Sequence, residues 1–238
     1  MKTLVFLTAY NEEKTIGDVL DRLIAVTGDI DHPTEILVVD DGSEDSTAAI
    51  AATREVTLIE HPRNLGPGAA TQTGYKYAVR KGFDVTVRMD ADGQHLPEEV
   101  PKLLDPIADD EADIVIGSRY KSETGYETST VRDSGIRFYS WLVSFVTGHR
   151  VYDITSGFRA VRIEMGEHHA ENLPRGIIAI DRGLREGLSE HRIKEVPVKM
   201  EQREHGRSYL KARRLVAYPL YPAYSFVGTL LQWNRNRQ

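Results

Sequence analysis

Residues 85–95 read Val-Thr-Val-Arg-Met-Asp-Ala-Asp-Gly-Gln-His, an apolar-alternating run followed by two aspartates and a glycine. The alternation predicts a β-strand that ends at Asp90. A turn beginning at Gly93 can then bring the carboxylates of Asp90 and Asp92 toward one hard cation and the diphosphate that it bridges. The alternative is an Asp-Gly turn with two solvated carboxylates, and the motif by itself leaves that alternative open.

The same strand belongs to a longer alternation of strand and helix signals. Short apolar runs and stretches with helical spacing of apolar residues follow one another from the N-terminus onward. The expected strands cover residues 4–8, 35–40, 56–59, 85–90 and 113–116, and the expected helices cover 12–26, 47–53 and 68–81 and begin again at 97. Such repetition predicts an α/β fold with a mostly parallel sheet flanked by helices, which binds ligands at the carboxyl ends of its strands.

Polar clusters fall at three of those strand ends. They are Tyr10-Asn11-Glu12, Asp40-Asp41-Gly42-Ser43 and Asp90-Ala91-Asp92. One strand-end aspartate is usually a cap or a turn residue, whereas three polar ends on one sheet edge favour a ligand site. Residues 64–70, Asn-Leu-Gly-Pro-Gly-Ala-Ala, add a glycine turn that opens a helix, where N–H groups could meet a phosphate. An ordinary loop between two helix caps would have the same sequence pattern.

The composition indicates one soluble-type domain with room for a short appendage. The chain has 238 residues, of which 40% are hydrophobic and 28% charged, so it can bury one sizeable core. A formal net charge of -6 argues against a nucleic-acid partner, whose footprint would be basic. The absence of cysteine excludes disulfides, thiolate metal sites and a cysteine nucleophile. The apolar run after Met1-Lys2-Thr3 is too short for a signal peptide, so we expect cytosolic synthesis.

Six short motifs, taken in order, resemble the signature of family 2 glycosyltransferases. They are Ala9-Tyr10-Asn11-Glu12-Glu13, Val39-Asp40-Asp41-Gly42-Ser43, Asn64-Leu65-Gly66, Met89-Asp90-Ala91-Asp92-Gly93-Gln94-His95, Gly117-Ser118-Arg119-Tyr120 and Ser156-Gly157-Phe158-Arg159. The resemblance covers roughly residues 2–200 and is closest to the polyprenyl-phosphate (dolichyl-phosphate) mannosyl- and glucosyltransferases and their soluble relatives. It implies the GT-A nucleotide-sugar-binding fold and an inverting transfer from a nucleoside-diphosphate sugar.

The resemblance also implies which residues form the donor site. The nucleotide-sugar-binding set is Thr8, Tyr10, Glu12, Asp40, Asp41, Asp90, Ala91 and Asp92. Within it, Tyr10, Glu12 and Asp41 would hold the nucleoside, and Asp40 would support their turn. Thr8 stands where the family often places a proline that lines the base, so the identity of the base stays open.

A divalent cation, Mn²⁺ or Mg²⁺, would be carried by Asp90, Asp92 and Gln94 according to the same resemblance. Negative charge develops on the nucleoside diphosphate as the glycosidic bond breaks, and a cation together with an arginine would stabilise that charge. Arg119 is the best candidate for the arginine, so Asp92 and Arg119 are candidate catalytic residues. The alternative for Arg119 is a purely local ion pair, for example with Glu123.

The acceptor decides the rest of the mechanism. An alcohol needs a positioned general base, for which Asp153 is the candidate, whereas a polyprenyl phosphate is already anionic and needs positive anchors. The candidate anchors are Arg119, Arg132 and Arg137. Asp153 could instead simply cap the turn that follows it. The family pattern Arg-Arg-x-x-Ser keeps only its first arginine in residues 132–136, and at 176–182, where the family often has acidic side chains, only Asp181 is acidic.

Two segments bear on membranes. Residues 138–146 are rich in aromatic and aliphatic side chains, and residues 215–233 carry no charge. Pro219 and Pro222 favour an interfacial or partner-bound helix over a membrane span for the second segment, and packing onto the domain or a dimer interface also stays open. Basic residues that could face anionic headgroups or an acceptor phosphate precede it: Arg203, Arg207, Lys211, Arg213 and Arg214.

We therefore expect a GT-A catalytic domain over residues 1–208, with a donor half to about 118 and an acceptor half from about 119, and an amphipathic helical appendage over 209–238. The expected activity is metal-dependent transfer of a hexose to a polyprenyl (dolichyl) phosphate at the inner face of the cell membrane, where the cytoplasmic protein would be peripheral, with a small membrane partner as a further option. The alternatives are transfer to a hydroxyl of a polysaccharide or glycan, and a noncatalytic nucleotide-sugar-binding subunit. A sugar-nucleotide pyrophosphorylase is disfavoured because residues 8–14 lack its glycine-rich loop.

Overall fold

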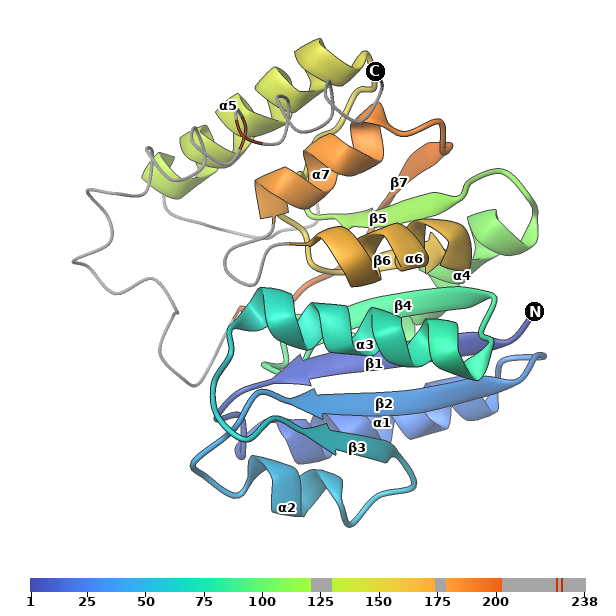
Figure 1. The fold of residues 1–238 in the computed structure, drawn as a ribbon, viewed down its shortest axis with the longest axis vertical. Helices are drawn as coiled ribbons and strands as arrows, with labels where there is room; N and C mark the ends of the chain where they lie inside the picture. Colours follow the sequence, from blue (N-terminus) through green and yellow to red (C-terminus); the bar gives the residue numbers. More distant parts are fainter. Residues whose placement is uncertain (121–129, 174–178, 203–225, 227, 229–238) are drawn as a thin grey trace.

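The computed structural model describes residues 1–120, 130–173, 179–202, 226 and 228. In these ranges a sheet in the order β3-β2-β1-β4-β6-β5-β7 carries helices on both faces (Figure 1). The strands are β1 (Thr3–Ala9), β2 (Thr34–Asp40), β3 (Thr57–Glu60), β4 (Val85–Asp90), β5 (Ile114–Ser118), β6 (Arg159–Arg162) and β7 (Ile193–Pro197). The helices are α1 (Ile16–Gly28), α2 (Thr47–Ala51), α3 (Pro67–Lys81), α4 (Val100–Ala108), α5 (Thr130–Thr147), α6 (Ile163–Asn172) and α7 (Ala179–Leu188), with a 3₁₀ turn at Pro97–Glu99 before α4.

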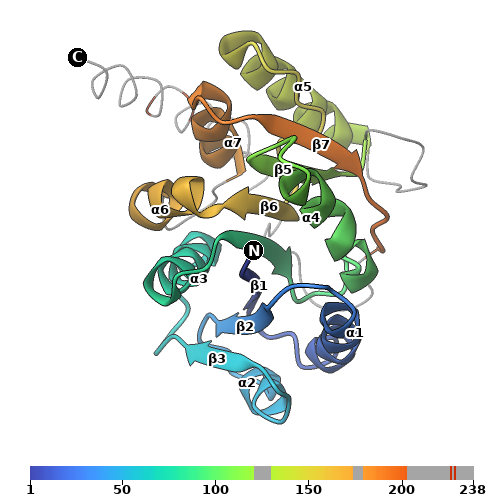
Figure 2. The same cartoon turned by 90° about the vertical axis from the view of Figure 1, so that its right-hand side faces the viewer.

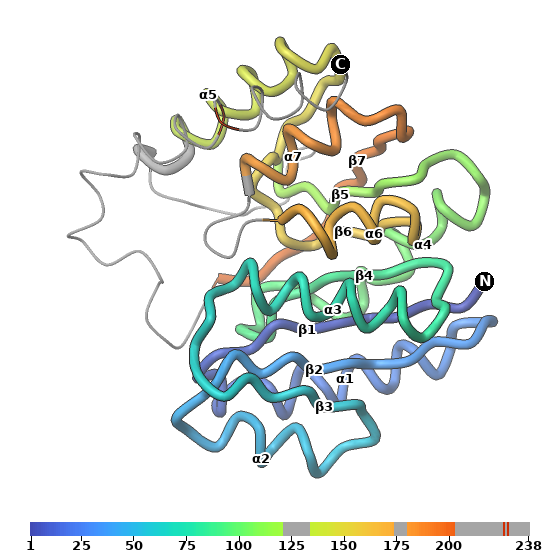
Figure 3. The backbone as a smooth tube through the Cα atoms, in the orientation of Figure 1, coloured from blue at the N-terminus to red at the C-terminus, as the bar shows by residue number. Residues whose placement is uncertain are grey.

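The predicted α/β class and mostly parallel sheet are confirmed. Strand pairs β1–β2, β1–β4, β2–β3 and β5–β7 are parallel, so the carboxyl ends of β1, β2 and β4 meet at one edge (Figure 3). Strand β6 runs antiparallel to both β4 and β5 and joins the two parallel groups. Because β2, β1 and β4 are neighbours in the sheet, the polar clusters that follow them lie side by side at one edge.

Two apolar cores hold the layers together. One lies between the sheet and helices α1, α2 and α4, and the other between the sheet and α3, α5, α6 and α7. Figure 2 shows α3, α6 and α7 on one side of the sheet and α1 and α4 on the other. In β4, Val85, Val87 and Met89 face the first core by strand alternation, which turns Arg88 toward the second. The charged side chain of Arg88 is thus buried close to the carboxyl end of β4.

The first helix begins later than its apolar spacing predicts, at Ile16 rather than at residue 12. Asn11 has a φ of 55°, and the N–H groups of Asn11 and Glu12 donate to Ser43 Oγ (2.9 Å) and Thr47 Oγ1 (2.8 Å). These N–H groups join the loop after β1 to the loop after β2 and to the first residue of α2. The polar cluster at residues 10–12 consequently stays at the sheet edge.

None of the helices in the described part of the chain combines the length and apolar content needed to cross a membrane. The predicted segment 215–233, the basic residues before it and the predicted domain boundary at 208/209 lie outside the described residues.

Gly74 in α3 is a close-packing position that provides a test of this fold. A Cβ at Gly74 would lie 2.4 Å from the Phe6 ring. Gly74→Ala is expected to lower the free energy of unfolding by about 1–3 kcal/mol because the core must shift to admit the methyl group. Gly28→Ala is the matched control, since a Cβ there meets nothing within 4 Å. Urea unfolding of both variants measures the difference, and equal losses in the two would contradict this packing.

Candidate active site

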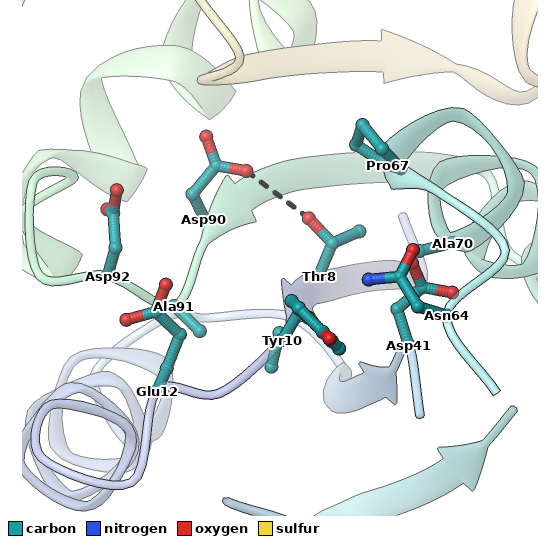
Figure 4. A pocket seen from close by; sticks show the side chains of 11 residues that line it. Thr8, Tyr10, Glu12, Asp41, Asn64, Pro67, Ala70, Asp90, Ala91 and Asp92 are labelled. Atoms are coloured by element: carbon teal, nitrogen blue, oxygen red, sulfur yellow. Dashed lines mark hydrogen bonds between the residues drawn. The ribbon is translucent and has the colours of Figure 1, made fainter. Parts of the chain in front are cut away.

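A cavity of about 220 Å³ opens at the carboxyl ends of β1, β2 and β4 (Figure 4). It is lined by Thr8, Ala9, Tyr10, Glu12, Asp41, Asn64, Pro67, Ala70, Asp90, Ala91 and Asp92. Of the predicted nucleotide-sugar-binding residues, only Asp40 is absent from this lining, and the predicted cation ligand Gln94 is absent as well. The structure therefore brings side chains from three strand ends into one cavity, as the polar clusters predicted.

Asp40 and Asp41 stabilise the loops around this cavity in different ways. The Asp40 carboxylate accepts hydrogen bonds from the N–H (2.9 Å) and the hydroxyl of Ser43, which closes the turn after β2. The Asp41 carboxylate accepts from the N–H groups of Leu65 (3.0 Å) and Gly66 (2.8 Å) and contacts His61 Nδ1 at 2.7 Å. Asp41 thus fixes the glycine turn that opens α3 while it also lines the cavity.

Gly42 makes this arrangement possible. Its φ is 73°, and a Cβ there would lie 2.4 Å from the carbonyl carbon of Arg63. The turn after β2 and the loop before α3 can approach each other only because residue 42 has no side chain.

Asp90 is held by three neighbours. Its Oδ1 accepts from Arg88 Nη2 at 2.5 Å and from Thr8 Oγ1 at 3.2 Å, and its N–H donates to His95 Nδ1 at 2.9 Å. Burial is the largest single effect on the Asp90 carboxyl and raises its pKa, but the nearby positive charges, with Arg88 foremost, and the hydrogen bond from Thr8 together outweigh burial, so the pKa of Asp90 lies below its usual range. Burial lowers the pKa of His95 to about 4, so its Nδ1 can accept this hydrogen bond at neutral pH.

Asp92 reaches the same cavity from the turn after β4. Its Oδ1 accepts the N–H of Gln94 at 3.1 Å, which orients the carboxylate, and the Gln94 carbonyl accepts the N–H of Glu201 at 3.0 Å. Within the described ranges no group of three or more His, Cys, Asp or Glu side chains is arranged to hold a metal. Asp90 and Asp92 still fit a hard divalent cation, because Mg²⁺ is commonly held by one or two carboxylates together with substrate phosphates.

Arg119 and Asp153 form a buried ion pair. Arg119 Nε and Nη2 donate to the two Asp153 oxygens at 2.7 and 2.8 Å, and Arg119 Nη2 also donates to Thr155 Oγ1 at 2.7 Å. Asp153 is fully buried. Burial is the largest single effect on Asp153 and raises its pKa, but the hydrogen bonds and charge of Arg119 and the hydrogen bond from Thr155 together outweigh burial, so the pKa of Asp153 lies below its usual range. A carboxylate with both oxygens engaged and a lowered pKa is poorly placed to act as the general base that the sequence suggested.

The two other candidate anchors, Arg132 and Arg137, both belong to α5. Arg137 is exposed on α5, and its guanidinium lies 5.9 Å from the centre of the Tyr120 ring. The guanidinium of Arg119 lies 5.6 Å from the centre of the same ring. The structure therefore gathers these two cations around Tyr120. Arg132 belongs to α5, but its side chain is outside the described part of the chain.

Sequence reasoning missed two groups of site residues. Asn64, in the loop before α3, and Pro67 and Ala70, in the first turn of α3, line the cavity, although the sequence indicated only a glycine turn at residues 64–70 and no individual site residue there. Arg88 and its contact with Asp90 were also missed. The signal for Arg88 was a charged residue in the middle of an otherwise apolar predicted strand.

Comparisons with known proteins agree with this geometry. The model of the glycosyl transferase family 2 matches residues 4–169. The chain is 34% identical over 239 residues to the polyprenol monophosphomannose synthase of Mycolicibacterium smegmatis, covering 90% of this chain and 83% of that protein. It is 33% identical over 224 residues to the undecaprenyl-phosphate mannosyltransferase of Micrococcus luteus, covering 87% of each. A Methanococcus voltae UDP-N-acetylglucosamine--dolichyl-phosphate N-acetylglucosaminyltransferase is 36% identical over 177 residues, which are 66% of this chain and 67% of that one.

Solved structures share the fold at lower identity. The glucosyl-3-phosphoglycerate synthase of Mycobacterium tuberculosis, in complex with Mn²⁺, UDP and phosphoglyceric acid, superposes with a TM-score of 0.65. It is 20% identical, and the match covers 97% of this chain and 78% of that one. The mannosyl-3-phosphoglycerate synthase of Rubrobacter xylanophilus gives a TM-score of 0.66 at 16% identity, covering 100% and 75%. These similarities identify the architecture as the GT-A fold.

Proposed function

Because this chain belongs to glycosyl transferase family 2, we propose that it transfers a hexose from a nucleoside-diphosphate sugar to a polyprenyl phosphate. The observation that carries the proposal is the cavity in which Asp90 and Asp92 meet the nucleoside-side residues Tyr10 and Asp41. The relatives that match most of this chain are named for sugar transfer to polyprenyl or undecaprenyl phosphates. The names of these relatives and the residues of this cavity together support sugar transfer to a polyprenyl phosphate as the proposed reaction.

On the donor side, Asp90 and Asp92, with Gln94 next to them, would hold a divalent cation, Mn²⁺ or Mg²⁺. The Mn²⁺ named in the solved relative's complex supports this assignment. When bound, the cation would neutralise charge on the departing diphosphate. The fold holds the two carboxylates at the end of β4. Thr8 Oγ1 orients one oxygen of Asp90, and the Gln94 N–H orients one oxygen of Asp92.

Asp41 is proposed to read the nucleoside from the end of β2. Asp41→Ala is expected to weaken binding of the nucleoside without its phosphates by roughly 1–3 kcal/mol, because a charge-assisted contact is lost and the turn before α3 loosens. Calorimetry with the nucleoside alone measures the effect, and Glu44→Ala, exposed in the same loop between β2 and α2, is the control. Equal nucleoside affinity of the Asp41→Ala variant and the parent would reject this role.

On the acceptor side, we assign Arg119, Arg132 and Arg137 to the acceptor phosphate, in the half of the domain that follows β5. A phosphate monoester is an anionic nucleophile and needs orientation and charge neutralisation rather than a base. The engagement of Asp153 by Arg119 supports this acceptor, because the candidate base is already used as an ion-pair partner. Arg137 beside Tyr120 adds a second, exposed cation.

A lipid acceptor would be presented at a membrane surface, and α5 carries a fitting apolar stripe. Phe138, Trp141 and Phe145 are 54%, 60% and 75% exposed and contact one another through their rings. Aromatic side chains of this kind favour the interface between headgroups and acyl chains. We propose that the protein works peripherally at the inner face of the cell membrane, with α5 toward the lipid.

This orientation can be tested with anionic phospholipid vesicles. Replacing Trp141 and Phe145 together by Ser is expected to lower the vesicle-bound fraction by about tenfold in partition coefficient, because two exposed rings no longer leave water. Leu65→Ser removes an exposed apolar side chain elsewhere and is the control. Co-sedimentation decides between them, and unchanged partition of the α5 variant would contradict the orientation.

Transfer to a hydroxyl is the second candidate, since the fold neighbours are named for phosphoglycerate acceptors. A noncatalytic nucleotide-sugar-binding subunit is the third, and the presence of both Asp90 and Asp92 in the cavity argues against it. A panel of nucleotide sugars with Mn²⁺ or Mg²⁺, with and without short-chain polyprenyl phosphate, tests the proposal. We expect one donor to be consumed much faster when the polyprenyl phosphate is present, and no acceptor dependence with any donor would reject it.

A further inference from the structure

Arg88 is a charged side chain in the middle of a central strand, and it is 6% exposed. Burial of a guanidinium is unfavourable unless its charge and its donors are matched. Two more buried arginines, Arg159 and Arg182, lie near enough for the charge of each to act on the others. Arg159 and Arg182 share the buried carboxylate of Glu186, whereas the carboxylate that pairs with Arg88 is Asp90.

The hydrogen bonds of Arg88 point to a specific role. Among the described residues, its side chain donates only to Asp90 Oδ1 (2.5 Å) and Thr8 Oγ1 (3.3 Å), and its Nε has no partner. Thr8 Oγ1 in turn donates to the same Asp90 oxygen at 3.2 Å. Arg88 and Thr8 together fix one carboxylate oxygen of Asp90, and Figure 4 shows the other oxygen pointing away from Thr8.

Gly157 lies against the side chains of both Arg88 and Asp90. A Cβ at residue 157 would lie 2.1 Å from Arg88 Nη1 and 3.0 Å from Asp90 Oδ2. A side chain at residue 157 would therefore push aside Nη1 of the guanidinium whose Nη2 holds Asp90 Oδ1. This close approach is a physical reason for a glycine at residue 157 of the motif 156–159.

The residues on either side of Gly157 hold it in place. The Phe158 ring stacks on His95 with centres 4.9 Å apart, and His95 is the acceptor of the Asp90 N–H. The Ser156 carbonyl accepts from Arg159 Nε at 2.9 Å and from Arg182 Nη2 at 2.7 Å. The segment 156–159 is thereby fixed to the core through Ser156 and to the carboxyl end of β4 through His95.

We propose that Arg88 and the segment 156–159 form a positioning device that fixes Asp90 Oδ1 and leaves Oδ2 for the divalent cation of the donor complex. This inference rests on the proposed function, because it concerns the cation that the donor would bring. Arg88 is a positioning residue here and touches neither the donor nor the reacting atoms. The steric condition at Gly157 makes the device sensitive to a single methyl group.

The test compares Mn²⁺ affinity with nucleoside affinity in the same variants. Gly157→Ala is expected to weaken Mn²⁺ binding in the presence of the nucleoside diphosphate by about tenfold or more, as loss of an outer partner of a metal ligand does. Affinity for the nucleoside without phosphates is expected to stay within about twofold, since Asp41 lines the cavity and Gly157 does not. Electron paramagnetic resonance of free Mn²⁺ gives the first affinity, and calorimetry gives the second.

Arg88→Lys and Arg88→Met separate charge from geometry. The lysine keeps a cation with N–H donors but not the planar guanidinium, so it should recover part of the Mn²⁺ affinity that the methionine loses. Gly28→Ala, with open space around its Cβ, is the control and should match the parent in both affinities.

Each contrary result has a separate meaning. If the parent shows no Mn²⁺-dependent binding of any nucleoside diphosphate, the metal-dependent function fails and the positioning role fails with it. If the parent does, while Gly157→Ala and Arg88→Met stay within about threefold of it, only the positioning role is overturned. Parallel loss of both affinities in Arg88→Lys would also overturn it, because Arg88 would then support the whole domain rather than Asp90.

Discussion

Asp92→Asn is expected to abolish the Mn²⁺-dependent tightening of nucleoside-diphosphate binding and to lower sugar transfer by about 100-fold or more. Asp92 lines the donor cavity, and its Oδ1 is oriented by the Gln94 N–H at 3.1 Å. An asparagine keeps the shape of the side chain but removes the negative charge that holds a hard cation. The cation's share of charge neutralisation on the leaving diphosphate is lost with it.

Calorimetric titration with a nucleoside diphosphate, with Mn²⁺ and then with chelator, measures this effect directly. Asp105→Asn, exposed on α4, is the matched control, because it makes the same chemical change away from the cavity. The parent and the control should lose affinity when chelator is added, and Asp92→Asn should not respond. Titrations of the parent that are identical with and without chelator would contradict the metal assignment.

Asp153→Asn is expected to destabilise the protein by about 3 kcal/mol or more, because it breaks a buried ion pair and removes the Asp153 charge from beside Arg119. Both side chains are largely excluded from water, with 9% of Arg119 and none of Asp153 exposed. Urea unfolding measures the loss. Replacing both residues together, Arg119→Met with Asp153→Leu, should recover much of the stability, since no uncompensated charge then remains.

The same variant distinguishes the two mechanisms. If Asp153 only positions Arg119, the loss of stability and the loss of transfer should occur together, and the pH profile of the residual transfer should keep its shape. If Asp153 is a general base, Asp153→Asn should lose more transfer than its loss of stability explains, and the acidic limb governed by that carboxylate should vanish from the profile. That second outcome would make a hydroxyl the better acceptor assignment.

The donor side of the site was predictable from local sequence. Each of β1, β2 and β4 ends in a polar cluster, and parallel pairing of these strands brings the three ends to one edge. Predicting a ligand site at this edge needed only strand boundaries and the rule that ligands bind at carboxyl ends, whereas the donor roles of its residues were implied by the family resemblance. The same reasoning could not show that Asp41 also accepts N–H groups from residues 65 and 66, because that contact depends on the path of a loop.

The acceptor side depended on contacts that are distant in sequence. Arg119 and Asp153 are brought together by β5 and the segment before β6, and no local pattern couples them. Strand β6 has only four residues, two of them arginines, so its apolar pattern is too short to predict a strand. Its antiparallel place between β4 and β5 nevertheless carries Gly157 to Asp90.

The most direct test of the acceptor compares a short-chain polyprenyl phosphate with the polyprenol of the same chain, using the preferred nucleotide sugar and Mn²⁺. Mass spectrometry of the lipid products reports which of the two receives the hexose. We predict a glycosylated polyprenyl phosphate and no product from the polyprenol, because the phosphate supplies both the nucleophile and the charge that the arginines bind. Efficient transfer to the polyprenol, or to a glycan hydroxyl but not to the polyprenyl phosphate, would contradict the proposed function.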